Sequence, residues 1–214
     1  MARKTARGGK RAKRSAPRKK ARRSRAARRT RETSISVRLD VDGRGRVEIR
    51  TGVGFFDHML ELVARHAMWD LKLVGRGDRQ VDDHHLVEDA GIVLGAALAD
   101  ALGNKKGVSR YGWARVPMDE AMAEAALDLS GRAFLFTQGL PARGRIGSFD
   151  LELVEEFLRA LTDNARMTLH VEVIRGRNRH HVLEAAFKSL GRALRAACSP
   201  DPRERGVPST KGRL

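Results

Sequence analysis

The chain has 214 residues, of which 41% are hydrophobic, and a formal net charge of +17. It is long enough to bury a core, its single cysteine cannot form an internal disulfide, and no apolar run reaches the roughly 18 residues of a membrane span. These features exclude a disulfide scaffold and a membrane-spanning protein, and they favour a cytoplasmic location.

The positive charge is concentrated at the N-terminus. Residues 1–27 contain 13 Lys or Arg and no acidic residue. They have no large apolar side chain after Met1, so we expect a basic tail that is disordered when free. Such a tail would contact nucleic acid or other acidic surfaces non-specifically, in a salt-dependent way. Because the remainder is close to neutral, the charge does not indicate the function of the folded part.

The next segments alternate between strand and helix patterns. Residues 32–51 predict a hairpin with one buried face, turning at Asp42-Gly43, and residues 55–70 have helical spacing. A short strand at 71–75, a loop and a helix at 84–102 follow. The side chains expected in the core are Ile35, Val37, Leu39 and Val41 on the hairpin and Met59, Leu60, Val63 and Met68 on the first helix.

The second half repeats this order. Two strands are predicted within 114–139, then a helix at 148–166, a strand at 167–176 and a closing helix at 180–198. The repetition predicts an internally duplicated α+β fold of two β-β-α-β-α halves, about 28–107 and 108–214, within one domain at 28–214.

The last predicted helix of each half begins with the same short motif. "HHLVE" starts at His84 and "HHVLE" starts at His180. Residues four apart share a helix face, so Glu88 can bind an ion together with one histidine. Adjacent residues diverge by about 100°, so two adjacent histidines cannot easily bind the same ion. One copy alone is more often a polar first turn of a helix. The second copy, with its carboxylate at the same offset, favours a metal site.

Together with two further histidines, the motifs supply six imidazoles and two carboxylates, enough for two ions. This set suits manganese, iron or zinc better than calcium or magnesium. The candidate metal ligands are His58, His84, His85, Glu88, His170, His180, His181 and Glu184.

Six ordered motifs carry a resemblance to a known family. They are "TGVGFFDHML", "VDDHHLVEDAGIVLGAAL", "VPMDEAMAEAALDLSGRAF", "TLHVEV", "HHVLEAAFKSLGRAL" and "VPSTKGRL". From about Arg28 to Leu214 the chain resembles imidazoleglycerol-phosphate dehydratase of histidine biosynthesis. It departs from the family pattern at "HAMWDL" and "SGRAF", neither of which touches a candidate ligand.

The resemblance implies a duplicated fold of four-stranded sheets backed by helices, assembled into a 24-subunit shell with metal sites at subunit interfaces. The implied reaction is loss of water from D-erythro-imidazole-glycerol phosphate to give imidazole-acetol phosphate. Two manganese ions per site would act as Lewis acids and as a template for the imidazole ring.

The resemblance also implies roles for five other residues. Glu32 corresponds to the family's substrate-site glutamate and is the candidate for proton transfer. Four residues correspond to its contacts with the substrate phosphate, which a guanidinium, a hydroxyl and an ammonium can hold. These are Arg110, Arg132, Ser209 and Lys211.

Two other classes of function remain open at this point. A nucleic-acid-binding protein with a scaffold domain is supported by the basic tail but not by the 5% aromatic content. A two-metal hydrolase would typically need carboxylates that bridge its ions, and neither of the two ligand carboxylates obviously does so.

Overall fold

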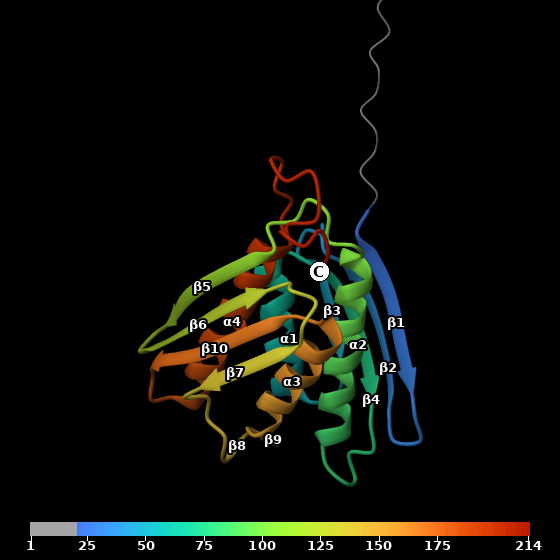
Figure 1. Cartoon of the computed structure of the whole chain (residues 1–214). Coiled ribbons are helices and arrows are strands. Elements are labelled where there is room, and N and C mark those ends of the chain that lie inside the picture. Colours follow the sequence, from blue (N-terminus) through green and yellow to red (C-terminus); the bar gives the residue numbers. More distant parts are fainter. Residues whose placement is uncertain (1–20) are drawn as a thin grey trace, which may run out of the picture.

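The structure is a computed structural model and describes residues 21–214. Two four-stranded sheets form the outer layers, and four helices lie between them (Figure 1). None of the helices in these residues is long and apolar enough to cross a membrane.

The first half contains one more strand than predicted. Sheet 1 has the order β1-β2-β4-β3, and the helices α1 and α2 follow β3 and β4. The bounds are β1 Arg23–Arg29, β2 Ser34–Asp40, β3 Val47–Arg50, α1 Gly54–Ala67, β4 Asp70–Arg76 and α2 His84–Leu102.

The second half has the same layout. Sheet 2 has the order β5-β6-β10-β7, and a small pair of strands, β8 and β9, precedes α3. The bounds are β5 Tyr111–Met118, β6 Ala121–Asp128, β7 Phe134–Gln138, β8 Arg145–Ile146, β9 Phe149–Asp150, α3 Leu153–Ala165, β10 Thr168–Arg175 and α4 Arg179–Cys198.

The α+β class, the four-stranded sheets and their helical backing are confirmed. The predicted order of each half is wrong by one strand: it is β-β-β-α-β-α, apart from β8 and β9. The hairpin is also wrong, because β4 lies between β2 and β3, and β3 pairs with β4 in parallel. A parallel pair needs a crossover, which α1 supplies.

The predicted tail is too long at its C-terminal end. Residues 1–20 lie outside the described part of the chain, so the partner proposed for them stays a prediction. Residues 23–27 belong to β1, which pairs with β2 along its whole length. The Ser24 hydroxyl donates to the carbonyl of Ala97 in α2 at 2.7 Å, and Arg28 forms an ion pair with Asp89 at 2.7 Å. These contacts tie a basic strand to the helical layer.

The predicted core is largely confirmed. The four apolar residues of β2 and its following turn are buried, as are Met59, Leu60 and Val63 of α1. Met68 is the exception: it caps α1 in a left-handed conformation and is 38% exposed, while the next residue, Trp69, is fully buried.

Each motif-bearing helix packs against the first helix of the other half: α2 against α3, and α4 against α1. Gly95 in α2 and Gly191 in α4 occupy the same position relative to the first histidine of their motifs. A Cβ atom at Gly95 would lie 2.6 Å from the carbonyl oxygen of Leu161, and one at Gly191 would lie 2.6 Å from that of Val63. Only glycine allows these backbones to approach so closely. The pairing of α4 with α1 positions the site described next.

Candidate functional site

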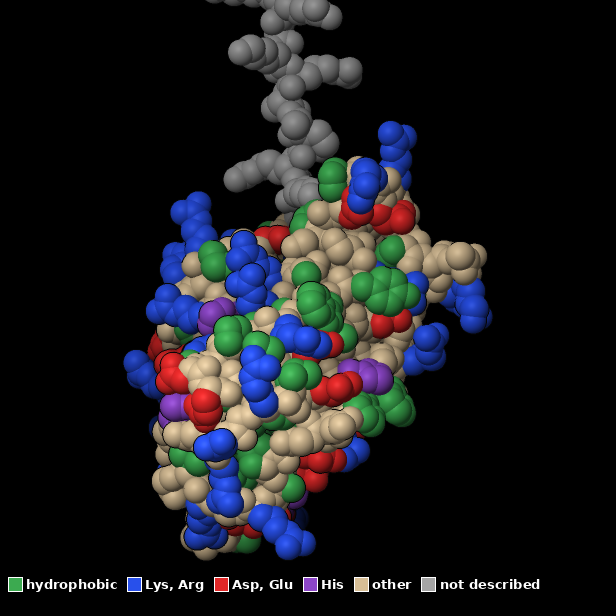
Figure 2. Space-filling view, turned by 90° about the vertical axis from the view of Figure 1, so that its left-hand side faces the viewer, with side chains coloured by type: hydrophobic (Ala, Val, Ile, Leu, Met, Phe, Trp, Pro, Cys, Tyr) green, Lys and Arg blue, Asp and Glu red, His purple; other side chains and the backbone are tan. Residues whose placement is uncertain are grey.

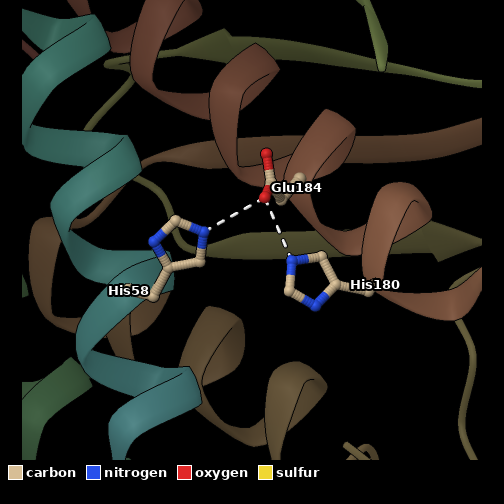
Figure 3. A group of neighbouring side chains, drawn as sticks. All are labelled: His58, His180 and Glu184. Atoms are coloured by element: carbon tan, nitrogen blue, oxygen red, sulfur yellow. Dashed lines mark hydrogen bonds and ion pairs between the residues drawn. The ribbon is translucent and has the colours of Figure 1, made fainter. Parts of the chain in front are cut away.

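Three of the predicted metal ligands meet where α1 packs on α4. His58 Nε2 lies 3.1 Å from Glu184 Oε1, and His180 Nε2 lies 3.0 Å from the same oxygen. Both rings point toward this carboxylate (Figure 3). His180 and Glu184, four residues apart on α4, are thus in direct contact.

Glu184 is held as a charged carboxylate. It is the least exposed member of the cluster, with a side chain 11% exposed, and its second oxygen pairs with Lys188 Nζ at 2.5 Å. Burial opposes the charge, but hydrogen bonds from Lys188, His58 and His180 outweigh it and lower the pKa of Glu184 to about 2. Because Lys188 takes the other oxygen, Oε1 is left facing the two imidazoles.

The backbone and a neighbouring aromatic ring orient His180. The Asn178 side chain caps α4 by accepting the His180 backbone N–H at 2.9 Å. The Phe55 ring meets the imidazole edge to face, with centroids 5.3 Å apart. Two imidazole nitrogens and one carboxylate oxygen within 4.8 Å of one another fit a borderline divalent metal ion such as manganese.

A second cluster contains the candidate for proton transfer. Glu32, in the loop between β1 and β2, places Oε2 4.0 Å from His85 Nδ1. The same nitrogen lies 3.1 Å from Asp78 Oδ2, in the loop before α2. The hydrogen bond to Asp78 raises the pKa of His85, with a smaller contribution from Glu32. Asp78 was not predicted, because nothing in the local sequence marks it.

The remaining predicted ligands are not gathered into either cluster in the described residues. His84 and His85 have ring centroids 6.0 Å apart at 84°, and His180 and His181 have theirs 6.3 Å apart at 88°, as expected for adjacent helical residues. His181 Nδ1 instead meets Glu120 Oε2 at 2.8 Å. This bond raises the pKa of His181 and, with backbone N–H groups, lowers that of Glu120 to about 2. The other three are His84 and Glu88 in the first turns of α2, and His170 on β10.

His170 lies on the outer face of sheet 2 among exposed aromatic side chains. Its neighbours across the sheet are Ala126 and Phe136, and Trp113 lies beyond Ala126. The Phe136 ring centroid is 5.2 Å from that of His170. A hollow of about 420 Å³ opens beside His170 and Trp113.

The predicted phosphate contacts lie near the C-terminal end of α4, whereas His180 and Glu184 lie near its N-terminal end. Arg110 forms a two-pronged ion pair with Asp128 at 2.7 and 3.0 Å and donates to the Pro208 carbonyl at 2.7 Å. The C-terminal residue Leu214 lies against Gly131, where a Cβ atom would approach it to 2.5 Å. Ser209 and Lys211 belong to this same C-terminal segment, and Arg132 follows Gly131. The four predicted residues therefore share one region.

A family model and individual proteins match this chain. The model of the imidazoleglycerol-phosphate dehydratase family matches residues 51–194. The dehydratase of Cereibacter sphaeroides is 55% identical over 194 residues, covering 90% of this chain and all of the relative, and that of Thermoanaerobacter pseudethanolicus is 53% identical with the same coverage.

Two solved structures also match this chain. The Staphylococcus aureus dehydratase superposes with a TM-score of 0.75 at 40% identity, covering 83% of this chain and 99% of that one. The Pyrococcus furiosus dehydratase gives a TM-score of 0.75 at 35% identity, covering 88% and 99%.

Proposed function

The chain belongs to the imidazoleglycerol-phosphate dehydratase family, whose enzymes act in histidine biosynthesis, and we propose that its dehydration reaction depends on two manganese ions per site. The convergence of His58, His180 and Glu184 carries this proposal. Membership of a dehydratase family removes the hydrolase alternative.

The eight candidate ligands would hold the ions through imidazole nitrogens and two carboxylates. When bound, the ions supply Lewis-acid polarisation and a template for the substrate ring. Glu184 is already charged and already faces two Nε2 atoms, so no proton must leave it before it binds a cation. The exposed carboxylate of Glu32 would move a proton between the substrate carbons and water, next to the imidazole of His85.

One chain cannot bring all these groups to one small substrate. Arg110 accompanies the C-terminal end of α4, because its N–H donates to the Ala197 carbonyl, whereas Glu184 lies in the first turns of the same helix. At 1.5 Å per residue, the two ends are about 20 Å apart. This distance exceeds the length of a short phosphorylated triol with one imidazole ring. It supports a site formed between subunits.

The outer face of sheet 2 is suited to contact another copy of the chain. Trp113 is 61% exposed and Tyr111 is 60% exposed, and Phe134 and Phe136 continue the apolar face around His170. Large exposed apolar patches usually mark an interface. We therefore propose that this face, with His170 and Arg110, meets the His58, His180 and Glu184 cluster of a neighbouring subunit in a 24-subunit shell, the assembly that the family resemblance implies.

Mixed assemblies test this sharing of ligands. The variants His170→Ala and His180→Ala are each expected to be inactive alone. Co-expressed at equal amounts, they should regain about a quarter of wild-type activity. In a randomly mixed shell, that fraction of interfaces has an intact His170 from one subunit and an intact His180 from the other. The measurement is ketone formation by tagged, purified mixed shells.

The double variant mixed with wild type is the matched control. This mixture should also have about a quarter of wild-type activity if His170 and His180 of one site come from different subunits, but about half if one chain supplies both residues. Mixed single variants with no more activity than either alone would show that the site is not shared.

A further inference from the structure

The second histidine of each motif has its Nδ1 atom against a carboxylate that was not predicted. His85 Nδ1 lies 3.2 and 3.1 Å from the two carboxylate oxygens of Asp78. His181 Nδ1 lies 2.8 Å from Glu120 Oε2. Figure 2 views the side of the molecule on which α4 begins, where histidines reach the surface close to acidic side chains. The same contact thus occurs in both halves.

These contacts set which ring nitrogen carries the proton. A carboxylate can only accept a hydrogen bond, so Nδ1 must be the donor in both histidines. In the neutral imidazole the other nitrogen, Nε2, then has a free lone pair, which is the form that binds a metal ion. Near His181 Nε2 the structure places Asp119 Oδ2 at 3.7 Å, on a side chain that is 69% exposed and beyond hydrogen-bonding distance.

The two carboxylates do not occupy equivalent positions in the duplication, because the turn that carries Glu120 corresponds to the β1–β2 loop of Glu32 and not to the loop of Asp78. Asp78 lies in the loop between β4 and α2, whereas Glu120 lies in the turn between β5 and β6. The positions do not correspond in the two halves, yet each places an acceptor on the same nitrogen of the same motif histidine. The first histidine differs, because His180 contacts Glu184 through Nε2. Two unrelated loops supplying one contact indicate a functional requirement.

From this geometry we infer that Asp78 and Glu120 are positioning residues that hold His85 and His181 with Nε2 free for a metal ion. The inference rests on the proposed metal dependence. Such outer contacts fix the ring orientation and the tautomer of a ligating histidine, and losing one typically costs 10- to 100-fold in metal affinity.

The two carboxylates are held differently, which makes their amide variants distinguishable. Glu120 Oε1 accepts the backbone N–H groups of Arg177 and Asn178 at 3.2 and 2.8 Å, while Oε2 faces His181. In Glu120→Gln the amide oxygen stays on the backbone groups, so the NH₂ faces Nδ1. An NH₂ group can only donate, so the imidazole proton moves to Nε2 and blocks the metal lone pair.

Asp78 has no such anchor among its side-chain contacts in the described residues, since both of its oxygens face His85. The amide of Asp78→Asn can therefore turn its oxygen toward Nδ1 and keep the tautomer. If Asp78, with Glu32 and His85, instead bound an ion directly, as their spacing permits, Asp78→Asn would lose a charged ligand and bind metal poorly.

Manganese affinity of the metal-stripped, assembled enzyme tests the inference. Relative to wild type, Glu120→Gln and Asp78→Ala should bind manganese about 10- to 100-fold more weakly, and Asp78→Asn should bind within about threefold. With saturating manganese, kcat should recover substantially in Asp78→Ala, because the chemistry itself does not use this side chain. Titration calorimetry and turnover against manganese concentration provide the two readouts.

Matched surface variants control for charge and folding. Glu48→Gln and Asp40→Ala remove carboxylates that pair with Lys72 and Arg23 on sheet 1, and both should bind manganese like wild type. Wild-type affinity in both Glu120→Gln and Asp78→Ala would overturn the inference, and weak binding by Asp78→Asn would overturn the positioning role of Asp78. A wild-type protein that binds no manganese would instead refute the proposed metal dependence.

Discussion

Replacing Glu184 by glutamine is expected to abolish dehydration while leaving the fold intact. The glutamine side chain would preserve the volume at this position, and its carbonyl oxygen could still accept a hydrogen bond from Lys188. The substitution would remove the charge that converges with His58 Nε2 and His180 Nε2. A bound metal ion supplies several kcal/mol of transition-state stabilisation, so kcat should fall by about 10³-fold or more.

The same variant should also lose metal. Elemental analysis of the purified protein should show about one manganese ion per subunit in Glu184→Gln, compared with two in the wild type, while Glu48→Gln should retain both. A Glu184→Gln enzyme with full metal content and near wild-type kcat would rule out this carboxylate as a ligand.

Replacing Glu32 by glutamine should also lower the activity, but without loss of metal. The carboxylate of Glu32 lies 4.0 Å from His85 Nδ1 but is more than half exposed, as suits a group that exchanges protons with water and substrate. Loss of a general acid or base typically lowers the rate by about 10² to 10⁴-fold. We therefore expect kcat to fall by that factor with metal content and KM little changed.

Steady-state kinetics and metal analysis on one preparation separate the two roles. The Glu32→Gln enzyme should hold as much manganese as wild type, in contrast to Glu184→Gln. If Glu32→Gln loses manganese, the residue is a ligand, and if its kcat is unchanged, it transfers no proton in the rate-limiting step.

The edge strand β1 shows where sequence patterns fail. "RSRAARR" contains no large apolar residue, and the sequence predicts that its residues 23–27 belong to the disordered tail. It forms a strand because β2 offers a complete hydrogen-bonding edge and because Ser24 and Arg28 bond to α2. Tertiary context outweighs local propensity here. By contrast α2 begins and ends where predicted, since its apolar spacing and its terminal glycine are both local signals.

The candidate site likewise combines one contact that local sequence predicts with others that only the tertiary structure reveals. The motif at His180 and Glu184 is visible from spacing alone, because four residues along a helix is a local distance. The partnership of Glu184 with His58 spans 126 positions and depends on the approach of α1 to α4 at Gly191. Helix spacing marks neither Asp78 nor Glu120 as a site residue, since loop geometry brings them to their histidines.

Restoration of activity to metal-free enzyme is the most direct test of the proposed function. Protein stripped with a chelator should show no conversion of imidazoleglycerol phosphate to imidazole-acetol phosphate, and activity should return in proportion to manganese bound, levelling off at about two ions per subunit. Full turnover by the stripped protein, or two bound ions without ketone formation, would contradict the account.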